Sequence, residues 1–261
     1  MSTTAIVVAL ISGGISLAAA AVSFRGQRSV ARLNSQLEEQ RSAAAVRARY
    51  RDPLLSAVFD LQSRIYNIVA QDFLVDYLLG GDERDRAYAV ENTLHVLAEY
   101  LGWVEILRRE IQFLDLGDEV ADRKWTKSLE AVRDRLADDK IDPVLRLFRG
   151  EQRAIGELMI LPTTDPGVRP QHCVGFAKFA TCRKEPEFGR WFDQLEADLD
   201  LLAKEPGDHL ERLLLLHGAL IDVLDVLDPE CKRFAPKNRG RLSKQHVYER
   251  SAHSGLRRPR A

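Results

Sequence analysis

The chain has 261 residues, enough for one large domain or two small ones, and its three cysteines (Cys173, Cys182 and Cys231) form no CxxC pair. An odd number of cysteines without that spacing argues against a disulfide framework and fits a reducing compartment. The sequence lacks the GxSxG elbow, the Walker phosphate loop, HExxH and GxGxxG, so the common signatures of hydrolases, NTPases, zinc proteases and dinucleotide enzymes are excluded.

The formal net charge of −1 conceals a strong segregation of charge. Residues 25–51 carry seven arginines against two glutamates (+5), and residues 232–261 carry ten lysines and arginines against one glutamate (+9), which leaves −15 on residues 52–231. An acidic body therefore lies between two basic ends, and an electrostatic partner has to be assigned to one part of the chain. A body at −15 repels phosphate, which argues against nucleic acid as a partner.

The N-terminal stretch 5–24 (AIVVALISGGISLAAAAVSF) is uncharged and is followed by Arg25, Arg28 and Arg32. At about 1.5 Å per residue, a helix of this length covers roughly 30 Å, the thickness of a bilayer's hydrocarbon core. We therefore expect residues 1–24 to form a transmembrane anchor. The positive-inside rule then places the N-terminus outside and the C-terminal domain in the cytoplasm of a single-pass cell-membrane protein. A cleaved signal peptide or a buried soluble helix is the alternative, but a signal peptide carries its positive charge before the apolar run.

Residues 25–51 are expected to continue as a basic juxtamembrane helix. An apolar residue recurs there every three to four positions, in the thin stripe Val30, Leu33, Leu37 and Ala44. Such a stripe favours a solvated stalk over weak coiled-coil pairing with a second copy. Asp52 and Pro53 then supply an N-cap and a proline at the first helical position, so a new helix should begin there.

Residues 52–231 are expected to form an acidic, all-α domain, a bundle of about six helices. Apolar residues keep the helical period over seven turns from Val90 to Leu114, which predicts a central helix. A third helix should follow Gly117, with the seam Trp125, Leu129, Val132 and Leu136. A fourth should start at Asp142-Pro143 and stop at Pro162, with Val144, Phe148, Ile155 and Leu158 on one line.

Residues 162–186 lose this periodicity and contain four prolines, which predicts a long binding loop or lid. A β-hairpin pairing GELMIL with CVGFAKF is a minority alternative. Helical periods resume from Phe188 and again from Leu210, and Pro229 ends the ordered body. Residues 232–261 are basic and poor in large apolar residues, so we expect a disordered tail that contacts anionic lipid.

Glu151 is the most conspicuous candidate for a site, because it falls on the apolar line of the expected fourth helix. A buried carboxylate there would need an arginine partner, and Arg64 and Arg109 are the candidates, with Arg149 beside it. A buried ion pair that sets helix register, or a helix that breaks at Gly150 and turns Glu151 outward, is the preferred interpretation. A ligand-binding or catalytic carboxylate is the alternative.

Other polar clusters are interpreted as structural. Glu91, His95 and Glu99 stand four residues apart and should form a solvated helix face, and His217 should be a core histidine. His172, Cys173 and Cys182 lack a further ligand for a metal, and Glu105 with Arg109 is an ordinary i,i+4 pair. The sequence therefore predicts no catalytic residue, no metal and no cofactor.

The phrases YRDPLLSAVFDLQSRIYNIV, YLGWVEILRREIQFLDLGD and FRGEQRAIGELMI resemble a group of actinobacterial membrane-anchored helical proteins with no assigned activity. The resemblance covers most of the body and implies no functional residue. The function expected from the sequence is a membrane-tethered, cytoplasmic interaction or scaffold domain that binds a partner protein or itself. The alternative is a tethered ligand-binding protein or hydrolase with a site near Glu151 under the 162–186 loop.

Overall fold

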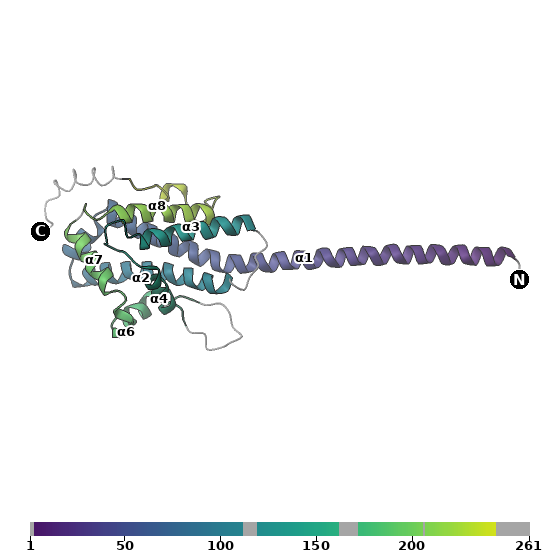
Figure 1. Cartoon of the computed structure of the whole chain (residues 1–261), viewed down its shortest axis with the longest axis horizontal. Helices are drawn as coiled ribbons and strands as arrows, with labels where there is room; N and C mark the ends of the chain where they lie inside the picture. The colour runs from purple at the N-terminus through teal and green to yellow at the C-terminus, as the bar shows by residue number, and fades with distance from the viewer. Residues whose placement is uncertain (1–2, 112–118, 162–171, 206, 244–261) are drawn as a thin grey trace. The chain divides into compact units, whose positions relative to one another are not determined.

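A computed structural model describes residues 3–111, 119–161, 172–205 and 207–243 (Figure 1). These residues form eight α-helices, one π-helix and one 3-10 helix, and no β-strand, which confirms the expected all-helical fold. In chain order the elements are α1 (Thr3–Ala70), the π-helix η1 (Val75–Leu79), α2 (Glu83–Ile111), α3 (Glu119–Ala137), α4 (Arg149–Leu158), α5 (Phe176–Cys182), α6 (Pro186–Gly189), α7 (Asp193–Lys204), α8 (Glu211–Leu227) and the 3-10 helix η2 (Pro236–Asn238).

The chain divides into two compact units, Met1–Ala48 and Arg49–Ala261. In the first unit the stripe residues Val30, Leu33 and Leu37 are exposed. Among the residues that the structure describes, no helix is long and apolar enough to cross a membrane. The backbone of the expected anchor, residues 5–24, is helical in α1, and its side chains other than Phe24 lie outside the described residues. The anchor therefore stays a prediction.

Helix α1 passes through Pro53, where we expected a new helix to begin. Proline has no N–H to donate to the carbonyl four residues earlier, which costs a helix about 3 kcal/mol in its interior. Tyr50 before the proline and Leu54, Leu55 and Val58 after it are all buried. Burial on both sides of Pro53 holds the chain helical, so packing overrides the local start signal.

The second unit packs its helices around the apolar faces of α1, α2 and α8. Helix α3 lies along α8, and α4 packs against α2 (Figure 1). The residues at the centre of these contacts are fully buried: Val58, Ile106, Val132, Ile155, Leu220 and Leu224. The expected seam of α3 is confirmed at Leu129, Val132 and Leu136, which are buried against α8 and its neighbours.

A buried arginine fixes the connection between α3 and α4. Arg212 lies in the first turn of α8 and is 1% exposed, and its guanidinium group donates to five backbone carbonyls at 2.5 to 3.2 Å. The acceptors are the carbonyl oxygens of Arg135, Leu136, Asp138, Asp142 and Val144. Two of these acceptors, Arg135 and Leu136, lie in the last turn of α3, where the carbonyl groups have no N–H partner within the helix.

Three acidic side chains hold the rest of this connection. Asp142 accepts from the backbone N–H of Val144, and the buried Asp198 accepts from that of Leu145, whose φ of 55° is left-handed. His209 Nδ1 lies 2.7 Å from Asp142 Oδ2, and hydrogen bonds to Asp142 and then Glu205 raise the pKa of His209. Because the chain is pinned in this shape, α4 starts at Arg149 and not after Pro143, which corrects the expected fourth helix.

The expected 162–186 loop is partly helical in the described residues. Helix α5 lies within it, and an isolated antiparallel bridge joins Ile160 to Cys173, with Val174 N–H donating to Met159 O at 2.8 Å. The minority β-hairpin prediction is thus realised only as one bridge. Residues 162–171 lie outside the described residues.

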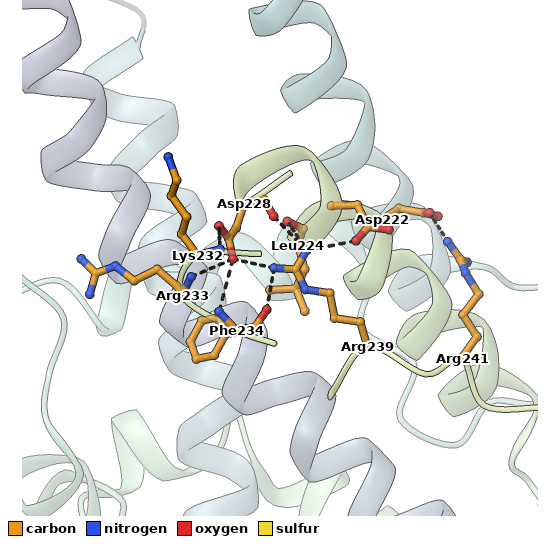
Figure 2. Close-up of polar contacts among 9 residues, drawn as sticks. Asp222, Leu224, Asp228, Lys232, Arg233, Phe234, Arg239 and Arg241 are labelled. Atoms are coloured by element: carbon orange, nitrogen blue, oxygen red, sulfur yellow. Dashed lines mark hydrogen bonds and ion pairs between the residues drawn. The ribbon is translucent and has the colours of Figure 1, made fainter. Parts of the chain in front are cut away.

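The first twelve residues of the expected disordered tail are folded onto the bundle, which corrects that prediction. We call residues 232–243 the strap. Asp228, 2% exposed, accepts from the backbone N–H groups of Lys232, Arg233 and Phe234, and its Oδ2 lies 2.5 Å from Arg239 Nη2 (Figure 2).

Further contacts attach the strap to α1 and α8. The ring of Phe234 stacks on that of Phe59 with centroids 3.8 Å apart, and Arg233 pairs with Asp52. Figure 2 also shows Arg241 paired with Asp222 of α8. Disorder was expected because the strap has few large apolar residues, but specific arginine–carboxylate pairs replace the missing apolar burial. Residues 244–261 lie outside the described residues.

We predict that Arg212→Met lowers the free energy of unfolding by about 3–5 kcal/mol. Five backbone carbonyls lose their bonds to the guanidinium group while the apolar volume is kept, and of these the carbonyl of Leu136 retains the N–H of Leu147 as a donor. Urea unfolding followed by circular dichroism measures the change. Arg135→Met is the matched control, because its half-exposed guanidinium group has only a 4.0 Å contact with Asp138; it should cost less than about 1 kcal/mol. Equal effects of the two substitutions would contradict the role of Arg212.

We predict an acid-sensitive contribution from Asp228. Burial alone would raise its pKa, but the three backbone N–H groups and Arg239 outweigh burial and lower it. A carboxylate with a lowered folded pKa stabilises the protein above its unfolded pKa of about 3.9, and this stability is lost as the pH falls through the folded value.

Asp228→Asn should therefore cost about 3 kcal/mol at pH 7 and flatten the loss of stability below about pH 5. Chemical denaturation at several pH values measures both effects. Asp222→Asn, an exposed partner of Arg241, is the control and should cost less than about 1 kcal/mol. An Asp228→Asn profile parallel to that of the unchanged chain would contradict the prediction.

Candidate functional site

A cleft of about 240 Å³ opens between α2, α3 and α4. Its apolar floor consists of Leu101, Val104 and Leu107 of α2 with Trp125 and Leu129 of α3. Its rim carries four arginines and two glutamates: Arg108, Arg133, Arg149, Arg153, Glu105 and Glu130. We call this feature the α2–α3–α4 cleft.

Two glycines let α4 approach α2 closely enough to form one wall of the cleft. A Cβ atom on Gly156 of α4 would lie 2.7 Å from the carbonyl oxygen of Leu101, and one on Gly102 of α2 would lie 2.8 Å from Cβ of Met159. Real Cβ atoms do not approach so closely, so any side chain at either position would push the helices apart. The crossing of α2 and α4 therefore depends on these glycines.

The rim is a network of ion pairs. Glu105, 4% exposed, receives Arg108 and Arg109 at 2.7 and 2.8 Å. Across the cleft Glu130 pairs with Arg133 and Arg149. Burial alone would raise the pKa of both glutamates, but the arginines outweigh it and lower the pKa. Both carboxylates are therefore held ionised at neutral pH.

Two buried polar atoms beside the cleft have no hydrogen-bond partner among the described residues. Trp125 Nε1 is an unused donor and Gln152 Oε1 an unused acceptor. Gln152 is 4% exposed, and its Nε2 already donates to the carbonyl oxygens of Arg133 and Leu147, which fixes the orientation of the amide. Unsatisfied buried atoms cost stability, and in a cleft lining they mark a place for a ligand's own donor and acceptor.

The structure does not bring the predicted cluster together. Glu151 lies in the first turn of α4, where its Oε2 accepts from the backbone N–H of Phe148 at 2.7 Å. Within the described residues no ion pair joins it to Arg64 or Arg109. Glu151 therefore caps α4, which begins at Arg149 and continues through Gly150, so the expected helix break at Gly150 is not found there. Glu151 does not line the cleft.

The three predicted arginines have separate partners. Arg64 bonds Asn92 and stacks on Phe73, with its guanidinium carbon 4.0 Å from the ring centroid. Arg109 bonds Glu105 and lies 3.5 Å from Glu157. Arg149 lines the cleft and pairs with Glu130, and it is the one member of the predicted cluster that does so.

The other polar clusters contact the 172–183 segment. His95 is buried, with Nε2 3.2 Å from Val174 O and Nδ1 3.9 Å from Glu99 Oε2, so it is not on the solvated face that we expected. Burial lowers the pKa of His95. Arg183 lies 3.8 Å from Glu91. In the described part of the chain, no group of three His, Cys, Asp or Glu residues is placed to hold a metal. His217 is fully buried in α8, as expected.

Sequence reasoning missed Glu130, Arg133 and Gln152. A weak signal was present, because Glu130, Arg133 and Asp134 flank the apolar seam of α3 at helical spacing. That signal could not show that Arg149, nineteen residues after Glu130, meets the same carboxylate at 2.9 Å. The pairing depends on the fixed 138–148 connection.

We predict that Gly156→Ala destabilises the chain by about 2–3 kcal/mol, because its Cβ atom meets rigid backbone at Leu101. Gly150→Ala in the same helix is the matched control, because nothing lies within 4 Å of a Cβ there. The control should be neutral or stabilising by up to about 1 kcal/mol. Thermal unfolding distinguishes them, and a harmless Gly156→Ala would show that the crossing is not tight.

Comparison with known proteins assigns no family to the chain. No protein-family model, curated protein or solved structure matches it. The resemblance to actinobacterial membrane-anchored helical proteins therefore stays a prediction, and the role of the cleft has to be inferred from its own side chains.

Proposed function

We propose that the chain is a membrane-tethered, cytoplasmic interaction module whose α2–α3–α4 cleft binds a partner protein. The bound element is a peptide segment with one large apolar side chain flanked by carboxylates. The observation that carries this proposal is an apolar floor ringed by arginines on a body whose charge is otherwise strongly negative.

The size of the cleft suits a single anchoring side chain. A volume of about 240 Å³ is below the range of about 300–1,000 Å³ that is usual for sites that enclose a small molecule. Burial of one leucine, phenylalanine or methionine contributes about 1.5–3 kcal/mol, enough for a binding hot spot. The floor residues Leu107, Trp125 and Leu129 would contact such a side chain.

The charges of the rim favour an acidic partner. Four arginines against two glutamates give the lining an excess of positive charge, whereas residues 52–231 together carry −15. An acidic peptide is repelled by most of this body and attracted to the cleft, so electrostatics would direct it to one place. Arg149 and Arg153 are about half exposed and can exchange their present partners for a peptide carboxylate.

The unused polar atoms favour a peptide over a fatty acid. A peptide group supplies an acceptor for Trp125 Nε1 and a donor for Gln152 Oε1, whereas an ionised fatty acid supplies no donor. Binding also fits the cleft better than catalysis, because Glu105 and Glu130 are held ionised by arginines and have no proton to give.

The tether is proposed from residues 5–24 and the arginines that follow them. The tail can add lipid contact, but Arg233, Arg239 and Arg241 are already paired within the body. Residues 244–261 keep five basic residues against one glutamate, and we assign the non-specific, charge-driven contact with anionic lipid to them.

A tethered ligand-binding protein or hydrolase is the second candidate. It is favoured by the position of the cleft, whose lining includes Arg149 and Gln152, two residues close in sequence to the expected site at Glu151. The described residues of the 172–186 segment do not line the cleft, and neither does Glu151. A small molecule bound there would require another cover.

Photo-crosslinking in cells tests the proposal. A benzophenone amino acid replaces Thr126, an exposed residue of the lining, and a control chain carries it at the exposed Glu187 of α6. We expect a discrete protein adduct from position 126 only. Arg149→Glu should abolish it, and Arg190→Glu, which changes an arginine stacked on Trp191, should not. An adduct that survives Arg149→Glu, or no protein adduct, would contradict the proposal.

The same adduct tests the tether. It should sediment with membranes, resist carbonate washing and be released by detergent, because a spanning helix is not removed by salt or alkali. Deletion of residues 3–24 should move the chain to the soluble fraction while the adduct still forms. If carbonate extracts the adduct of the full chain from membranes, the proposed tether is contradicted, whereas the proposed interaction module is not.

A further inference from the structure

A second groove of about 440 Å³ lies between α1 and the strap. It is separate from the α2–α3–α4 cleft and shares no residue with it. One wall is the last part of α1 from Phe59 to Asn67 with Gln71 just after the helix, and the other is the strap from Lys237 to Arg241. Its volume falls in the range of about 300–1,000 Å³ that is usual for small-molecule sites.

The strap wall is held rigidly. Figure 2 shows Arg239 inserted among the carbonyl oxygens of Leu224, Asp228 and Phe234 and paired with the carboxylate of Asp228. Arg241 is fixed by Asp222 and by the carbonyl oxygen of Gly218. Groups held in place before binding lose little conformational entropy when a ligand arrives, so this groove is preorganised.

The lining has the chemistry of a hydroxyl-binding site. Four side-chain amides, one hydroxyl and one phenol line it: Gln62, Asn67, Gln71, Asn238, Ser63 and Tyr66. Amides offer both donors and acceptors, which is the combination that neighbouring hydroxyl groups of a polyol require. Tyr66 is 37% exposed and supplies a flat apolar surface for the carbon skeleton of such a ligand.

The groove also carries positive charge without a carboxylate in its lining. Lys237 is exposed, and no ion pair engages it within the described residues. Arg241, already oriented by Asp222, is the second cation. A lysine ammonium group binds phosphate as a point charge, so the two cations give the groove a local site for an anion on an otherwise acidic body.

We propose that this groove binds a phosphorylated polyol, with the phosphate on Lys237 and Arg241 and the hydroxyl groups on the amides of Asn67, Gln71 and Asn238. Neither the tether nor the partner peptide is needed for this binding. Two sources have the same chemistry: a soluble sugar or inositol phosphate, and the inositol phosphate headgroup of a membrane lipid.

Titration of the purified full chain tests the site. The probe is myo-inositol 1-phosphate, measured by calorimetry, with myo-inositol and inorganic phosphate as its two fragments. We expect saturable binding of the phosphorylated polyol that is at least tenfold tighter than that of either fragment. Vesicles of phosphatidylcholine with phosphatidylinositol 4-phosphate then distinguish the sources, because a lipid site binds them in competition with the soluble probe, whereas a site for soluble ligand ignores them.

Lys237→Gln should weaken binding about tenfold or more, because the phosphate loses its ammonium partner. Asn67→Asp should do the same, because the carboxylate cannot donate to a ligand hydroxyl group and adds negative charge to a groove that binds an anion. Lys232→Gln is the matched control, because this exposed lysine of the same strap pairs with Glu230 and does not line the groove. It should bind like the unchanged chain. No saturable binding, or equal losses from Lys237→Gln and Lys232→Gln, would overturn the proposal.

Discussion

The guanidinium group of Arg212 is the interaction on which the positions of α3, α4 and α8 depend. It lies fully inside the protein and binds five carbonyl oxygens at the end of α3 and in the connection to α4. A cation placed at the C-terminal end of a helix is favoured by the helix dipole, and the carbonyl groups replace the water that the charge has lost. Together with Asp142 and Asp198, Arg212 fixes the 138–148 connection, at whose end Arg149 meets Glu130.

Arginines close the end of α8 in a similar way. Arg51 of α1 donates to the carbonyl oxygen of Leu227, and Arg239 of the strap donates to those of Leu224 and Asp228. This gives the basic segments at the two ends of the acidic body a structural use. Arginines of these segments that the sequence left free for an outside partner instead bind carbonyl and carboxylate groups of the same chain.

The two proposed binding sites are lined by side chains other than these three arginines, Arg51, Arg212 and Arg239. The α2–α3–α4 cleft combines an apolar floor with arginines on loosely held rim positions, which suits a protein segment. The groove between α1 and the strap combines amides with Lys237, which has no ion pair within the described residues, and this suits a polar anion. Both sites carry positively charged side chains, whereas residues 52–231 as a whole are strongly acidic.

The amino-acid sequence by itself determined the all-α class, the central helix α2 and the seam of α3, because helical periodicity is a local property of neighbouring residues. It also marked Arg149, but it left Glu151 either in a buried ion pair or beyond a helix break at Gly150, whereas Glu151 caps the first turn of α4. The helix line that the sequence extended to Val144 is broken at Leu145 by a left-handed backbone. Only the tertiary structure decided the course of α1 through Pro53, the folding of the strap and the ion pairs around the cleft. These depend on contacts between residues far apart in the chain, such as Arg233 with Asp52 and Arg212 with α3, and on buried charges whose partners no local pattern specifies.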